Sequence, residues 1–195
     1  MTPIWSILIC TIPPRKAMLN LLLNELYHQI RECNLTDDIE ILWLTDEDGD
    51  KLTIGEKRQR LIEAANGKYV CFIDDDDWVA TEYIRFIHTV LLKDPDVVGL
   101  TGIITVNRKQ RTAARFIHSS RYKSYFKNKG VYYRPPNHLN PMLKTIAELV
   151  PFEYKSHGED TDWAMALCKL APYHRELYLE KPLYFYRYIM KPIWK

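Results

Sequence analysis

The stretch TIGEKRQRLIEAANGKYVCFIDDDDW, residues 53–78, contains the signals from which we predict the fold. Thr53 is followed three positions later by Glu56, which is the spacing of a capping box, so a helix is expected to start there. The pair Asn66-Gly67 tolerates the left-handed conformation that ends many helices. The run Tyr69–Ile73 is apolar throughout and predicts a strand buried on both faces. A helix followed by a buried strand is one unit of an α/β fold.

Four consecutive aspartates, Asp74 to Asp77, follow this strand directly. Ionised carboxylates repel one another, so a fold that gathers them normally has a cation to offset their charge. Oxygen ligands suit a hard divalent ion, and we therefore expect Mn²⁺ or Mg²⁺ at this position. The carboxyl end of a parallel strand is also where open α/β sheets bind ligands. A solvated acidic turn is the plainer alternative.

The rest of the chain supports an α/β fold, because short apolar runs alternate with amphipathic stretches in its first half. In that half we predict strands at Ile4–Cys10 and Ile39–Leu44 and helices at Ala17–Arg31 and Thr81–Leu92. The second half predicts strands at Val97–Val106, Ala113–His118, Val131–Tyr133, Leu177–Leu179 and Leu183–Ile189, and helices at Leu143–Leu149 and Glu159–Leu170. We expect an open, mostly parallel, Rossmann-like sheet flanked by helices.

Length and composition predict one domain over residues 1–195. A chain of 195 residues that is 47% hydrophobic and 27% charged can bury one sizeable core, and it shows no repeat. The apolar start lacks the features of a signal peptide, and no apolar run approaches the roughly 20 residues that cross a bilayer. The four cysteines are widely spaced and are expected to be reduced. These features favour a cytoplasmic location without a transmembrane segment.

The net charge of +2 is unevenly distributed. No acidic residue lies between Asp96 and Glu148, and aromatic residues such as Tyr125 and Tyr132 are interleaved with the cations of this interval. The cations are Arg108, Lys109, Arg111, Arg115, Arg121, Lys123, Lys127, Lys129, Arg134 and Lys144. Such a segment indicates an anionic partner, although a solvated basic loop is the alternative.

Several of these residues together resemble the family 2 glycosyltransferases of the GT-A fold. Arg58-Gln59 matches the Arg-Asn pair of that family, Ala65-Asn66-Gly67 matches its Ala-x-Gly turn, and Asp74-Asp75-Asp76 matches its Asp-x-Asp metal motif. The chain departs from the family in having Gln59 and the additional Asp77. Further along, HGEDTDW at residues 157–163 resembles the Glu-Asp motif that contains the catalytic base of inverting members.

The resemblance implies a metal-dependent hexosyl- or pentosyltransferase that uses a nucleotide-diphosphate sugar, with a UDP-sugar as the expected donor. Residues 1–95 would bind this donor and residues 96–195 the acceptor. By the same resemblance the metal is held by Asp76 together with Asp74. The donor is contacted by Thr11, Pro13, Arg15, Asp46, Arg58, Asp74 and Asp75.

On the acceptor side, the resemblance makes Asp160 the general base, which implies inversion at the anomeric carbon. Glu159 and Trp163 are expected to shape the acceptor pocket, and His138 is expected to contact the acceptor. With the basic segment, this indicates an anionic acceptor: a glycan, a lipid-linked phosphate or a modified nucleic acid.

The sequence is also compatible with two other functions. A metal-dependent nucleotidyltransferase also uses clustered aspartates, although the phosphate-binding motif GxxxxGK[ST] is absent from this chain. A nucleic-acid-binding module would use the basic segment 108–134 and would leave the aspartates with a structural role.

Overall fold

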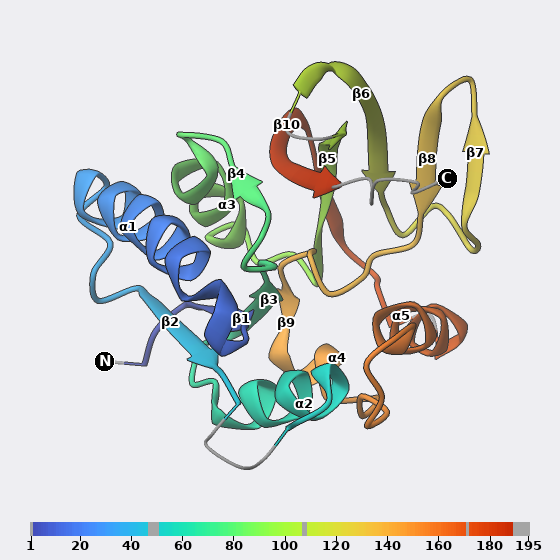
Figure 1. The fold of residues 1–195 in the computed structure, drawn as a ribbon. Helices are drawn as coiled ribbons and strands as arrows, with labels where there is room; N and C mark the ends of the chain where they lie inside the picture. Colours follow the sequence, from blue (N-terminus) through green and yellow to red (C-terminus); the bar gives the residue numbers. More distant parts are fainter. Residues whose placement is uncertain (1, 47–50, 107–108, 171, 189–195) are drawn as a thin grey trace.

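The computed structural model describes residues 2–46, 51–106, 109–170 and 172–188, in which helices pack on both faces of a mixed β-sheet (Figure 1). The strands are β1 (Trp5–Cys10), β2 (Ile39–Leu44), β3 (Tyr69–Phe72), β4 (Trp78–Val79), β5 (Val97–Val106), β6 (Lys109–His118), β7 (Phe126–Asn128), β8 (Val131–Arg134), β9 (Met142–Leu143) and β10 (Glu176–Tyr188). The helices are α1 (Lys16–Glu32), α2 (Ile54–Ala64), α3 (Tyr83–Leu91), α4 (Lys144–Ala147) and α5 (Glu159–Leu170), with a 3₁₀ turn, η1, at Pro13–Arg15.

The sheet has the strand order β2-β1-β3-β9-β5-β6-β8-β7, and β10 pairs with β5 and β4. Strand β1 is parallel to both β2 and β3, as the alternating pattern of the first half predicts. Beyond β3 the sheet becomes mixed, because β9 is antiparallel to β3 and to β5. The carboxyl ends of β1, β2 and β3 therefore lie at one edge of the sheet, where ligands bind in folds of this kind.

Two hydrophobic clusters form the layers on the two sides of the sheet. Successive residues of β1 point to opposite faces, so Ile7 and Ile9 pack in the cluster that contains α1 and α3, whereas Leu8 packs in the other. The second cluster joins α2, α4 and α5 to β3 through residues such as Leu61 and Phe72. In Figure 1, α1 and α3 lie together on one side, and α2, α4 and α5 lie on the other.

Helix α2 begins as its sequence predicts but ends differently. The Thr53 hydroxyl accepts a hydrogen bond from the Glu56 N–H at 3.2 Å, which confirms the cap. The prediction of a left-handed Asn66-Gly67 pair is wrong, because neither residue has a positive φ and Ala65 ends the helix in extended backbone. Glycine is needed at position 67 for space: a Cβ there would lie 2.6 Å from the backbone nitrogen of Ser6.

The second half contains several elements that its pattern does not reveal. Strands β4, β7 and β9 have two or three residues each, too few to show a periodicity. The helix predicted at 143–149 is the single-turn α4, because Leu143 pairs in β9. The two predicted C-terminal strands are one strand, β10, with register shifts around Pro182; Ile189 lies outside the described residues.

Two further predictions concern the environment of the chain. All four cysteines are free, as expected. Within the ranges described above, none of the helices is long and apolar enough to cross a membrane.

Candidate functional site

The aspartates after β3 divide into two pairs, and one pair anchors the loop. Asp75 accepts hydrogen bonds from the Thr11 hydroxyl at 2.6 Å and from Arg15 at 2.8 Å. Asp77 accepts from the Tyr184 hydroxyl and from the Arg187 backbone N–H, both at 2.8 Å. Both carboxylates are buried. Asp75 therefore ties the loop to the end of β1, and Asp77 ties it to β10.

The other pair, Asp74 and Asp76, is less buried and lines cavities, the smaller of which Asp75 lines as well. Asp74 lies 3.1 Å from Nη2 of Arg58, and Asp76 lies 3.0 Å from Nη2 of Arg15. Burial alone would raise the pKa of Asp74, but the charge of Arg58 and the contact with His138 hold it well below its usual value. Burial, with the charges of Asp74 and Asp75, raises the pKa of Asp76 although Arg15 opposes this. Negative charge is thus incompletely offset at Asp76.

The fit of a divalent ion can be judged from these carboxylates. In the described part of the chain, no group of three or more His, Cys, Asp or Glu side chains is arranged to hold a metal. Mg²⁺, however, is usually held by one or two carboxylates together with substrate phosphates. Asp76 and Asp74 provide such hard oxygen ligands, and the raised pKa of Asp76 reflects a site that additional positive charge would stabilise. The residues therefore fit the expected ion.

A cavity of about 230 Å³ lies beside the loop. Several residues that are expected to contact the donor line it, and it is called the donor-side cavity for that expectation. Its wall includes Thr11, Arg15, Arg58 and Asp74 to Asp76. Pro13 is exposed and lines a separate hollow beside Trp43 on the outside of η1. The expected donor residues thus gather in one place with the exception of Pro13 and Asp46.

Asp46 connects to this cavity through a residue that the sequence analysis did not identify. The ammonium of Lys57 lies 2.6 Å from Asp46 and donates to the Thr11 carbonyl at 2.8 Å. Lys57 is 1% exposed and lines the donor-side cavity. A buried lysine needs a partner. The sequence offered one signal for Lys57, which was its position next to Arg58 on the predicted helix.

Arg58 occupies the centre of the site. Its guanidinium contacts Asp74 on the β3 loop and, at 3.3 Å, Glu159 at the start of α5. It also lies over the Phe72 ring, 4.9 Å from the centroid. Burial opposes the charge of Arg58, yet the neighbouring carboxylates, Asp74 first, raise its pKa above the usual value. Arg58 thus links the aspartate loop after β3 with the start of α5.

A second, larger cavity of about 740 Å³ begins at the same two residues, because Arg58 and Asp74 line both cavities. Glu159, Asp160 and His138 are also in its wall. The two cavities therefore adjoin, with the expected donor residues around the smaller one and the expected base in the larger one.

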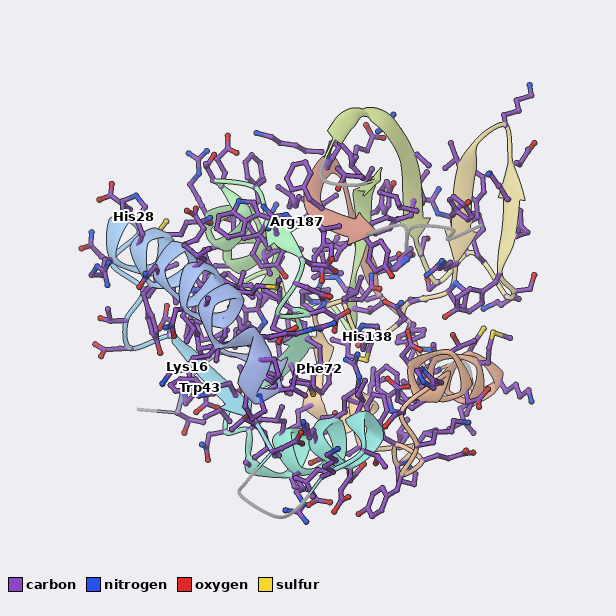
Figure 2. All side chains as sticks on the ribbon, in the orientation of Figure 1. Lys16, His28, Trp43, Phe72, His138 and Arg187 are labelled. Atoms are coloured by element: carbon purple, nitrogen blue, oxygen red, sulfur yellow. The ribbon has the colours of Figure 1, made fainter. Side chains whose placement is uncertain are left out.

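His138 lies between the two motifs. Its Nε2 is 3.5 Å from Asp74 and its Nδ1 is 3.5 Å from Asp160, and the side chain is buried. The Phe72 N–H donates to the His138 carbonyl at 2.7 Å, which holds the loop after β8 against the end of β3. Figure 2 shows His138 and Phe72 near the middle of the molecule. Both distances are longer than those of ordinary hydrogen bonds.

Trp163 is placed away from both cavities. It is 3% exposed, stacks on Phe152 with ring centroids 4.7 Å apart, and donates to the Val150 carbonyl at 2.9 Å. The expectation that it shapes the acceptor pocket is thus not supported by its position. Because its apolar ring fits the core between α5 and β3, Trp163 holds the start of α5 in place instead.

Known proteins resemble this chain in sequence and in fold. The model of the family described as "Glycosyl transferase family 2" matches residues 47–178. No curated protein matches the sequence significantly.

Solved structures of TarS from S. aureus have a similar fold. TarS 1–349 in complex with UDP-GlcNAc matches with a TM-score of 0.61 and 14% identity, over 96% of this chain and 59% of that one. TarS 1–349 in complex with UDP matches with a TM-score of 0.58 and 15% identity, over 94% and 60%. This chain thus spans about three fifths of the TarS 1–349 chains.

Proposed function

The chain belongs to glycosyl transferase family 2 and has the GT-A fold, and from this we propose that it transfers a sugar from a nucleotide-diphosphate sugar to an acceptor hydroxyl. We further propose that the reaction is metal-dependent and inverting. A UDP-sugar is the proposed donor, because the similar TarS structures contain UDP-GlcNAc and UDP.

One observation supports this proposal above all: two cavities meet at Arg58 and Asp74. A donor whose diphosphate lies in the smaller cavity has its sugar at the junction. An acceptor in the larger cavity then approaches that sugar from the side opposite the diphosphate. Attack from the opposite side inverts the anomeric carbon.

The residues have complementary parts in this reaction. Asp160 accepts the proton of the acceptor hydroxyl as its oxygen bonds to the anomeric carbon. The bond from that carbon to the diphosphate breaks, and the electron pair leaves with the diphosphate. Arg15 and Lys57 are placed to offset the developing negative charge. His138 is the positioning residue that holds Asp160 relative to Asp74.

Mn²⁺ or Mg²⁺ held by Asp76 and Asp74 would supply a Lewis acid for the leaving diphosphate. Arg58 keeps Asp74 ionised and so keeps it able to bind a cation.

Thermal stability measured with nucleotides and metal tests the proposal. Ligand at 100 times its Kd stabilises the folded chain by about 2.7 kcal/mol, which corresponds to a rise in Tm of roughly 5–10 °C. We expect this rise with UDP plus Mn²⁺, and a much smaller one with UDP plus a chelator. The Asp76→Asn variant is expected to lose the metal-dependent part.

Different results would exclude the proposal. If no nucleoside diphosphate raises Tm with or without metal, the chain does not bind such a donor. If nucleoside triphosphates are consumed with release of pyrophosphate, the protein is a nucleotidyltransferase. Release of UDP from a UDP-sugar, by contrast, supports glycosyl transfer.

A further inference from the structure

The wall of the larger cavity carries charges of both signs. The end that adjoins the donor-side cavity has the carboxylates of Asp74, Glu159 and Asp160. Another part of the wall, the β7–β8 end, is formed by β7 and β8 and contains Lys127 and Arg134. A ligand that bridges these ends would be held in a fixed orientation.

The two cations at the β7–β8 end are supported by aromatic rings. The guanidinium of Arg134 lies over the Tyr125 ring, 5.2 Å from its centroid. The ammonium of Lys127 lies 4.7 Å from the centroid of Tyr132 and donates to its hydroxyl at 3.2 Å. These contacts restrict both side chains without neutralising them.

Neither cation forms a salt bridge within the described residues, in contrast to the other strongly basic groups of the site. Arg58 is paired with two carboxylates, and Arg15 is paired with two others. The segment cannot supply a counterion itself, since residues 97–147 include no Asp or Glu. Arg108 lies outside the described residues.

His118, which also lines the larger cavity, is affected by the charge of Arg134. Burial, with the charge of Arg134 next in importance, lowers the pKa of His118 to about 3, so this buried imidazole is neutral at physiological pH. The positive charge at this end of the cavity therefore comes from Arg134 and Lys127.

The other aromatic residues of the segment contact one another. Phe126 stacks on Tyr133 with centroids 4.9 Å apart, and Tyr122 packs edge-on against both. These three rings pack on one another and do not line the larger cavity, whereas Lys127 and Arg134 do. The feature this end of the cavity offers to a ligand is therefore positive charge.

From these observations we propose that Arg134 and Lys127 form a phosphate subsite of the acceptor. The acceptor would place a phosphoryl group between these side chains and its reacting hydroxyl beside Asp160. A phosphoryl group has several charged oxygens, so it can accept from a guanidinium and an ammonium that approach from separate strands. This inference rests on the proposed function.

Binding of two phosphate probes tests the subsite. A short fluorescent single-stranded DNA oligonucleotide presents phosphodiesters, and glycerol 3-phosphate, compared with glycerol, presents a monoester. We expect Arg134→Gln and Lys127→Gln each to weaken binding of a phosphate probe about tenfold or more. For the oligonucleotide, the slope of log Kd against the logarithm of the salt concentration should decrease by about 0.7 for each cation removed.

Matched controls are available elsewhere on the chain. Arg85 on α3 also lies 5.2 Å over an aromatic ring, that of Phe86, and Lys169 is an exposed lysine on α5. Arg85→Gln and Lys169→Gln should bind both probes like the unaltered chain. Arg134→Lys keeps the positive charge and should therefore lose less affinity for the probes than Arg134→Gln. Comparison of these two variants separates the effect of the charge from the effect of a disturbed fold.

The outcomes distinguish the source of the phosphate and the status of both proposals. Binding of the oligonucleotide through these cations supports a phosphodiester acceptor, and binding of glycerol 3-phosphate alone supports a monoester. If neither probe binds, or if the Arg134 and Lys127 variants match their controls, the subsite is refuted. The UDP and Mn²⁺ measurement on the same protein tests the transferase separately, so oligonucleotide binding without UDP binding would leave a nucleic-acid-binding module.

Discussion

Replacement of Arg58 by methionine is the most informative perturbation of this protein. The Arg58 side chain is 5% exposed and Glu159, one of its partners, is 6% exposed, so the pair is buried rather than a surface ion pair. Methionine keeps the apolar contacts with Phe72 but removes the charge. Breaking a buried pair on one side costs about 3–5 kcal/mol, which corresponds to a Tm lowered by roughly 6–20 °C.

The loss of stability should depend on pH. In the folded chain the charge of Arg58 holds the pKa of Asp74 well below its usual value of 3.8. This interaction therefore stabilises the fold fully above that pH and is lost as the pH falls below it. Without Arg58, burial favours the protonated form of Asp74. The difference between the two proteins should therefore be greatest near neutral pH and should shrink below about pH 4.

Urea denaturation followed by circular dichroism at several pH values measures this difference. Arg60→Met is the matched control, because Arg60 lies on the same helix but is exposed and pairs with Glu56 at the surface. We expect that control to change the free energy of unfolding by about 0.5 kcal/mol or less. Equal effects of the two substitutions, or a loss for Arg58→Met that does not vary with pH, would refute the reasoning.

Four further predictions follow from the site and the fold. Asp160→Asn should lower the rate of sugar transfer about 10²–10⁴-fold while UDP binding by thermal shift is unchanged, and an active variant would exclude Asp160 as the base. Asp76→Asn should abolish the difference that Mn²⁺ makes to UDP binding in calorimetry; a retained difference would place the metal elsewhere. His138→Gln should lower kcat less than His138→Ala with little effect on the KM for the donor, whereas equal loss of stability and activity in both variants would indicate a purely structural histidine. Gly67→Ala should lower the free energy of unfolding by about 1–3 kcal/mol in urea denaturation, because the added Cβ clashes with β1. Gly130→Ala should lower it by about 1 kcal/mol, because Gly130 has a positive φ of 81° but lies in open space. A larger loss for Gly130→Ala than for Gly67→Ala would contradict the steric explanation.

Much of the fold was predictable because its signals are local. The Thr53 cap, the apolar run of β3 and the helix Glu159–Leu170 each depend on residues that are close in the sequence. Hydrophobic periodicity indicates which side chains are buried, and capping residues indicate where helices begin. The short strands β4 and β9 were missed because they form only by pairing with distant strands.

The site was predictable in its residue types but not in the tasks of individual residues. Four adjacent aspartates are chemically equivalent in the sequence. In the folded chain Asp77 is bound to β10 and lines neither cavity, whereas Asp74 lines both. Asp75 and Asp76 both line the smaller cavity, but Asp75 is buried and held there by Thr11 and Arg15. Similarly, Trp163 is in the core although its motif suggested the acceptor pocket.

By itself, the sequence determined the α/β fold, the position of the acidic loop at the end of a strand and the start of the helix that bears Asp160. The tertiary structure decided which carboxylates face the cavities, that His138 lies between Asp74 and Asp160, and that Lys57 joins Asp46 to β1. The reason is physical: backbone hydrogen bonds and apolar periodicity are local properties of the chain. Contacts between charged side chains from different elements exist only after the sheet and its two helical layers have packed.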